Sequence, residues 1–218
     1  MEIIKSYINA HFKTLFILFA LTVLSIFLLM IRLKVTHSFF YLFLVWNLFL
    51  AIIPFSISAY LKEKNNLSKA ALIIWSLIWL LFIPNAPYMV TDLVHLRLSP
   101  LSIICFDILM ILLFALTGLF SFYVSVSDMK ILVENHLNIS IPKYIQIALL
   151  FLVSFGVYLG RFLRFNSWDL IKNPLLLSHD IMVIVLSPIQ NMGAWIFTFS
   201  FGIVLWLGHQ LFQKYLRL

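Results

Sequence analysis

The chain has 218 residues, of which 63% are hydrophobic and only 11% are charged, and its formal net charge is +7. Soluble domains are usually close to half apolar and a quarter charged, so this composition excludes an ordinary soluble protein. Apolar runs of bilayer length recur from one end of the chain to the other. The sequence therefore predicts an all-α fold, a polytopic transmembrane helical bundle that forms one integral membrane domain over residues 1–218.

The basic residues are scattered at the expected helix ends and form no basic tract. In a membrane protein such a charge is mainly a topology signal, so it predicts contact with the lipid bilayer and no nucleic-acid partner. The single cysteine, Cys105, excludes an intramolecular disulfide and cysteine-cluster metal sites. Because Cys105 lies in an apolar run, it is expected to be a small, buried apolar residue.

About six spans are expected, and the third of them is broken by prolines. The first apolar run is interpreted as a retained span, because no small-x-small cleavage site follows it. The segment 181–186 is too short to cross alone and is expected to dip into the membrane, and it would form a seventh span if Pro188 helped it to cross. In chain order the expected spans are 14–31, 39–61, 70–90, 101–126, 143–163 and 193–212.

The loop cations predict the orientation, because cytoplasmic loops carry an excess of Lys and Arg. With six spans, both termini share one side with the loops near 62–69 and 127–143, and that side holds more cations than the other. Both termini are therefore predicted to be cytoplasmic, in a multi-pass protein of the cell membrane. The cations of the predicted inner side are Lys5, Lys13, Lys62, Lys64, Lys69, Lys130, Lys143, Lys214 and Arg217, and those of the outer side are Arg32, Lys34, Arg97, Arg161, Arg164 and Lys172.

Unusual polar groups collect on the predicted outer side, and this clustering is the main indication of a site. The carboxylates Glu2, Glu63, Asp128 and Glu134 fall on the inner side. The residues of the outer side, or of the outer half of the membrane, are Asp92, Asp107, Asp169, Asp180, His37, His95 and His179.

The third span is interrupted by Pro-Asn-Ala-Pro at 84–87, directly after an almost purely apolar run. A proline removes a backbone donor and leaves carbonyls free, and within a bilayer this is tolerated only where protein, water or a ligand satisfies those groups. Broken helices of this kind form binding sites in transporters. The alternative is a proline kink near the membrane surface, with Asn85 capping the next helical segment.

Asp92 and His95 follow the break at i, i+3 spacing, which places them on one face of a continuing helix. A carboxylate and an imidazole there could bind a metal, relay a proton or act as acid and base. With His179 and Asp180 they could complete a two-His, two-carboxylate site for zinc or another divalent cation. The alternative is an interfacial Asp–His pair that orients a loop.

Asp107 is expected about two turns into the fourth span. An ionisable residue at that depth is costly and is a functional hypothesis by default, with a charged partner expected. The predicted partners are Arg161, Arg164 or His95. The alternative is a buried structural ion pair.

Arg161 and Arg164 at i, i+3 spacing are expected to place two guanidinium groups on one helical face at the outer end of the fifth span. Arginine forks match carboxylate and phosphate oxygens bidentately, which favours a site for a lipid head group or a small anion. The alternative is that both arginines reach lipid phosphates or pair with Asp169 and Asp107. The polar residues that follow directly are Asn166, Ser167, Trp168 and Asp169.

Two long stretches resemble the bacterial domain of unknown function family numbered 1361. The first is 79–88 with Thr91, Asp92, Leu93 and His95, and the second is 156–169, in which Phe165 stands where the family often has tryptophan. The resemblance covers most of the chain and implies a bacterial multi-pass membrane protein. It implies no activity and assigns no catalytic residue.

The favoured hypothesis is a membrane protein that binds or transports a small anionic ligand or a lipid head group. The alternatives are an intramembrane enzyme acting on a lipid or envelope substrate, with a divalent metal as its cofactor in one version, and a structural or assembly protein. The sequence contains no P-loop, HExxH, GxSxG or GxGxxG motif, so ATP-driven and dinucleotide chemistry have no support. The candidate ligand-binding residues are Asn85, Tyr88, Asp92, Arg161, Arg164, Asn166 and Asp169, the candidate catalytic residues are Asp92, His95 and Asp107, and the candidate metal ligands are His95, His179, Asp92 and Asp180.

Overall fold

A computed structural model describes residues 11–64 and 67–216. These residues form helices joined by loops and contain no β-strand, so the all-α prediction is confirmed. The chain divides into two compact units, unit 1 with residues 1–138 and 217–218, and unit 2 with residues 139–216. Each unit is described by itself, and a single domain over 1–218 stays a prediction.

The expectation of six spans is confirmed for the described residues. A short apolar helix, α9 (Pro174–Leu186), covers the segment that was expected to be too short to cross. Its 13 residues extend for about 20 Å, whereas the hydrocarbon core is about 30 Å thick. The protein is therefore a multi-pass membrane protein whose apolar spans are Phe12–Thr36, Phe40–Lys62, Lys69–Leu98, Ile104–Leu137, Lys143–Arg161 and Met192–Tyr215.

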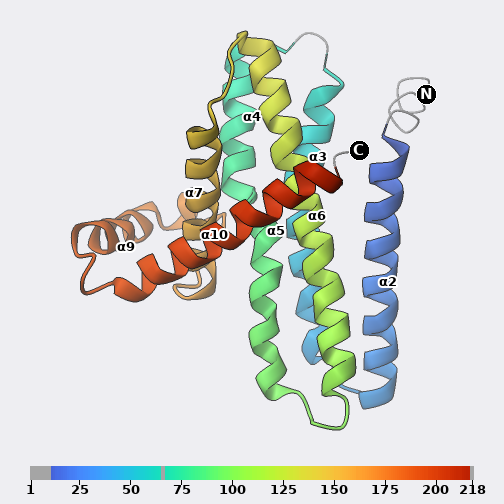
Figure 1. Cartoon of the computed structure of the whole chain (residues 1–218). Coiled ribbons are helices and arrows are strands. Elements are labelled where there is room, and N and C mark those ends of the chain that lie inside the picture. Colours follow the sequence, from blue (N-terminus) through green and yellow to red (C-terminus); the bar gives the residue numbers. More distant parts are fainter. Residues whose placement is uncertain (1–10, 65–66, 217–218) are drawn as a thin grey trace. The chain divides into compact units, whose positions relative to one another are not determined.

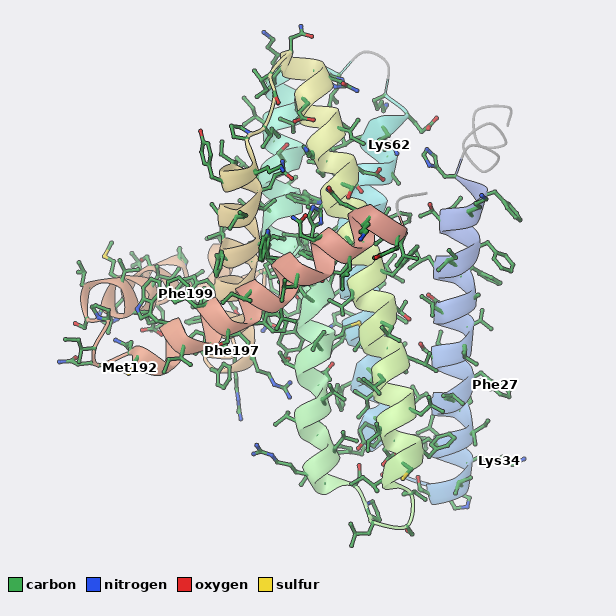
Figure 2. All side chains as sticks on the ribbon, viewed as in Figure 1. Phe27, Lys34, Lys62, Met192, Phe197 and Phe199 are labelled. Atoms are coloured by element: carbon green, nitrogen blue, oxygen red, sulfur yellow. The ribbon has the colours of Figure 1, made fainter. Side chains whose placement is uncertain are left out.

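Unit 1 is built around its longest helix, α6 (Ile104–Leu137), which packs against α2, α3, α5 and η2 (Figure 1). Half of the residues in the most apolar stretch of α6 are buried inside the protein, whereas this share is about a fifth to a third in the other spans. Phe114 and Phe122 on α6 are fully buried, whereas Phe27 on α2 is 54% exposed and points outward (Figure 2). The remaining elements of unit 1 are α2 (Phe12–Thr36), η1 (Phe40–Leu42), α3 (Phe43–Lys62), α4 (Lys69–Phe82), α5 (Asn85–Tyr88) and η2 (Met89–Leu98).

Two ion pairs mark the opposite ends of unit 1. Arg32 pairs with Asp107 at one end, and Lys62 pairs with Asp128 at 2.8 Å at the other. Asp128 lies 21 residues after Asp107 on α6, so the two pairs are about 31 Å apart along the helix, close to the hydrocarbon thickness of a bilayer. Figure 2 shows Lys34 and Lys62 at these two ends. We infer from this distance that one ion pair lies near each membrane surface.

Several predicted boundaries differ from the structure. The third span continues to Leu98 instead of ending near 90, and α6 continues to Leu137, so most of the predicted 127–143 loop is helical. The reason is that a helix can continue beyond the membrane surface when the residues of its last turns are polar and can face water. Cys105 is exposed and not buried as expected, because it lies on the outward face of the first turn of α6. The predicted topology residues Glu2, Lys5 and Arg217 lie outside the described residues.

Unit 2 contains two spanning helices, α7 (Lys143–Arg161) and α10 (Met192–Tyr215), which cross and pack against each other (Figure 1). A Cβ atom at Gly202 on α10 would lie 2.5 Å from the ring of Phe151 on α7, so the glycine permits this close approach. Between the two spans come a short helix, α8 (Asp169–Lys172), and α9. Unit 2 therefore presents the polar stretch after α7 on a packed helix pair.

Candidate functional site

The break in the third span is confirmed and has a defined geometry. Helix α4 ends at Phe82, and Pro84 precedes the single turn of α5, which continues into the 3₁₀-helix η2. The side-chain amide of Asn85 donates to the carbonyl oxygen of Phe82 at 2.9 Å. The N–H of Ala86 bonds to the oxygen of Ile83 at 3.2 Å and so turns away from Phe82. Asn85 therefore supplies a donor to that carbonyl oxygen, and it lies in the first position of α5, whose N-cap residue is Pro84.

The break lies inside the protein and does not face lipid. Ala86 and Pro87 are buried, and the carbonyl oxygen of Ala86 points at Gly118 on α6, where a Cβ atom would lie only 2.4 Å from it. Irregular backbone at membrane depth is tolerated when protein buries it. Gly118 is thus the residue that allows the broken segment to lie against the central helix.

Asp92 on η2 is fully buried, and its carboxylate accepts a hydrogen bond from the amide of Asn47 on α3 at 2.9 Å. Asn47 precedes Lys62 by 15 residues on α3, or about 22 Å along the helix. The Asp92–Asn47 pair is therefore roughly 9 Å nearer the bilayer centre than Asp107, by the same helical rise. A carboxylate at that depth is costly and needs the polar partner that α3 supplies.

His95 lies among aromatic rings. Its imidazole is 4.7 Å from the ring centre of Phe43 and 5.8 Å from that of Phe40, and its carbonyl oxygen accepts from the Tyr41 hydroxyl at 3.5 Å. In the part of the chain that the structure describes, no group of three or more His, Cys, Asp or Glu could hold a metal ion. The set His95, His179, Asp92 and Asp180 is divided between the two units, so it stays a prediction.

Asp107 is paired with Arg32 and not with the predicted Arg161, Arg164 or His95. The contact is bidentate, with Nε of Arg32 at 2.5 Å from one carboxylate oxygen and Nη2 at 3.0 Å from the other. The two side chains are 7% and 0% exposed. The pair corresponds to the structural alternative, and Asp107 lies in the first turn of α6, not two turns into the span.

Neighbouring hydroxyl groups complete this end of unit 1. The guanidinium of Arg32 donates to the hydroxyl of Thr36 and lies 5.4 Å from the ring centre of Tyr41. The Tyr41 hydroxyl is 2.5 Å from that of Ser99, which ties η1 to the chain after η2. Sequence reasoning had treated Arg32 only as a topology cation. Its position inside an apolar run, on the same predicted side as Asp107, was the signal that could have identified the pair.

In unit 2, the prediction that the two arginines at the end of α7 share one helical face is wrong. The helix ends at Arg161, and Arg164 has a left-handed backbone with φ 60°. The N–H of Phe165 bonds back to the oxygen of Leu159 at 3.1 Å. Arg164 is exposed and Arg161 is half-buried, so the turn directs Arg164 away from the helix axis.

Asp169 holds the turn that follows. Its carboxylate accepts from the backbone N–H of Asn166 at 2.6 Å, and its own N–H bonds to the oxygen of Asn166 at 2.9 Å. These two bonds close a turn from Asn166 to Asp169, directly at the start of α8, whose N-cap residue is Trp168. Further along, His179 and Asp180 are in contact at 3.2 Å on α9, with the histidine side chain 71% exposed.

The structure thus distributes the predicted ligand-binding residues over two units, with Asn85, Tyr88 and Asp92 in unit 1 and Arg161, Arg164, Asn166 and Asp169 in unit 2. Tyr88 is half-buried at the end of α5, and its carbonyl accepts from the hydroxyl of Thr91 at 2.6 Å. No curated protein and no solved structure matches the chain. A family model with the description "Protein of unknown function (DUF1361)" matches residues 46–207, a range that includes the broken span and the arginine turn. Since this match covers most of the sequence, the chain belongs to that family.

Proposed function

We propose that this multi-pass membrane protein binds a small anion or the phosphate of a lipid head group through Arg161 and Arg164. The observation that carries the proposal is the conformation of Arg164, which is exposed and held with φ 60° in a turn closed by backbone hydrogen bonds. A left-handed backbone costs a residue other than glycine about 1–2 kcal/mol. Strain of this kind is concentrated at binding sites, where the surrounding structure maintains it.

The chemistry of the turn fits an anion. Guanidinium groups bind phosphate and carboxylate bidentately through a rigid fork of donors. The carboxylate of Asp169 is engaged by the N–H of Asn166 and so stabilises the turn itself. Trp168 lies four residues after Arg164, and tryptophan at the end of a span lies at the level of lipid head groups.

Unit 1 supports this assignment indirectly. Its buried arginine, Arg32, is neutralised by Asp107 in a bidentate pair, which leaves that guanidinium committed to a structural contact. Two residues of the enzyme hypothesis make structural contacts, since Asp107 is bound by Arg32 and the His95 ring packs against Phe40 and Phe43. Both the binding and the transport hypothesis require that the ligand binds. Transport remains the second hypothesis, because broken helices such as the third span occur in transporters.

The test is a binding measurement on the purified full-length protein. Inorganic phosphate is titrated by calorimetry in detergent, and phosphatidylglycerol is titrated by native mass spectrometry, so that a free anion and a head group are distinguished. A hydrogen bond to a charged group contributes about 1.5–3 kcal/mol. Arg161→Ala and Arg164→Gly should therefore each lower the affinity for the ligand that binds at least about tenfold.

The matched control is Lys143→Gln, which removes one positive charge at the opposite end of α7. It should leave the affinity unchanged. If the two arginine variants bind as the wild type does, or if Lys143→Gln weakens binding equally, the proposal is rejected. If they lower only the melting temperature and the wild type binds neither ligand, the arginines have a structural role.

A further inference from the structure

An apolar groove runs along unit 1 between α3 and α4, away from the residues discussed above. It encloses about 300 Å³, which is at the lower end of the volumes of ligand pockets. The residues that line it are Phe49, Ile52, Ile53, Ser56, Ile57 and Tyr60 of α3 and Trp75 of α4.

The dimensions of the groove match one leaflet of a bilayer. From Phe49 to Tyr60 the lining covers 11 helical steps, or about 16 Å, which is roughly half of the 30 Å hydrocarbon thickness. In the middle of the groove, Ser56 donates its hydroxyl to the oxygen of Ile52 at 3.1 Å, so this hydroxyl is already engaged. An extended hydrocarbon chain satisfies this lining, whereas a transmembrane helix about 10 Å wide would need a face along both leaflets.

One end of the groove is aromatic and basic. The rings of Tyr60 and Trp75 are 5.8 Å apart, and the ammonium of Lys64 lies 5.1 Å from the centre of the Tyr60 ring. Lys62 is committed to Asp128 at 2.8 Å, whereas Lys64 is exposed, and Lys69 begins α4 nearby. This is the end of unit 1 that the Lys62–Asp128 pair places near a membrane surface.

We propose that the groove binds one acyl chain of an anionic phospholipid, with the lipid phosphate at Lys64 and Lys69. The chain lies along α3 within one leaflet, and the aromatic pair lies at the level of the glycerol backbone. The charge selects the lipid, because cations at the membrane surface attract anionic head groups. This lipid lies in unit 1 and is independent of the arginine turn in unit 2.

The experiment uses the full-length protein in detergent, titrated with phosphatidylglycerol and, separately, phosphatidylcholine, with bound lipid counted by native mass spectrometry. Lys64→Glu should weaken phosphatidylglycerol binding about thirtyfold, since each surface cation contributes on the order of 1 kcal/mol and the reversal changes two charges. Ser56→Phe should fill the groove and reduce binding of both lipids. Ser56 is exposed, so the larger side chain does not disturb the core.

The controls are Lys34→Glu at the opposite end of unit 1 (Figure 2) and Val23→Phe on the outward face of α2, where Val23 is 48% exposed. Both should bind phosphatidylglycerol as the wild type does. The proposal is overturned if the control variants lose as much affinity for phosphatidylglycerol as Lys64→Glu does, or if the wild type binds the two lipids equally well. It is also overturned if the wild type is a dimer and Ser56→Phe dissociates it.

Discussion

At the scale of single residues, the buried charge of Arg32 is tolerated because each of its three guanidinium nitrogens contacts an acceptor. Nε and Nη2 contact the two oxygens of Asp107, and Nη1 contacts Thr36. The desolvation cost of such a pair is large, so its attraction is expected to compensate for burial and to add little net stability. Its role is to fix the ends of α2 and α6 in register.

Removing one partner of this pair should therefore be costly. Arg32→Leu or Asp107→Leu should each lower the free energy of unfolding by about 3–5 kcal/mol, because an uncompensated buried charge remains. The double variant Arg32→Leu/Asp107→Leu should recover most of that loss. Unfolding in detergent and denaturant, followed by circular dichroism, measures the cycle. Additive losses in the double variant would show that the two side chains are not coupled.

A second prediction at this scale concerns the backbone conformation of Arg164. Because glycine adopts a positive φ without steric cost, Arg164→Gly should raise the free energy of unfolding by about 1 kcal/mol. Arg164→Ala removes the same charge and keeps the strained conformation, so it should not stabilise the protein. Thermal unfolding of both variants makes the comparison. Equal melting temperatures would mean that the strain is relieved elsewhere.

At the scale of elements, the third span combines three helical segments, the α-helices α4 and α5 and the 3₁₀-helix η2, which follow one another along the bundle (Figure 1). The prolines account for the change of geometry, since neither can donate a backbone hydrogen bond. The contact that buries the break comes from α6, where Gly118 leaves room for the carbonyl of Ala86. A side chain at Gly118 would meet backbone, which cannot rotate away.

Gly118→Ala should thus be destabilising although alanine favours helices. Overpacking a close contact costs about 1–3 kcal/mol, and the melting temperature should fall accordingly. Gly193→Ala is the matched control, since a Cβ atom there meets nothing within 4 Å, and its effect should stay within about 0.5 kcal/mol. Equal effects of the two substitutions would exclude the close packing of the break.

At the scale of the whole molecule, six crossings place successive loops on alternating sides of the membrane. The cations favour the side with Lys62, Lys130 and Lys143 as the cytoplasmic one. The separation of the two ion pairs in unit 1 agrees with a bundle that crosses the bilayer perpendicular to its plane.

Cysteine labelling tests this orientation. In a Cys105→Ser background, single cysteines at Ser38, Ser99 and Asn173 should react with a membrane-impermeant maleimide in intact cells. A cysteine at Asn138, which ends α6 in the loop before α7, should react only after permeabilisation. Reaction at Asn138 from outside would reverse the predicted topology.

The sequence by itself determined the class of fold and the number of spans, because apolar length and backbone satisfaction in a bilayer permit few alternatives. It also located the break, since proline acts locally. It could not identify Arg32 as the partner of Asp107, Asn47 as the partner of Asp92, or Gly118 as the residue beneath Ala86. Those contacts join residues at least 32 positions apart, and the rotation of each helix about its own axis decides them. In a lipid environment most faces of a helix are apolar, so hydrophobic periodicity does not specify that rotation. Only the packing of the helices in the tertiary structure determines it.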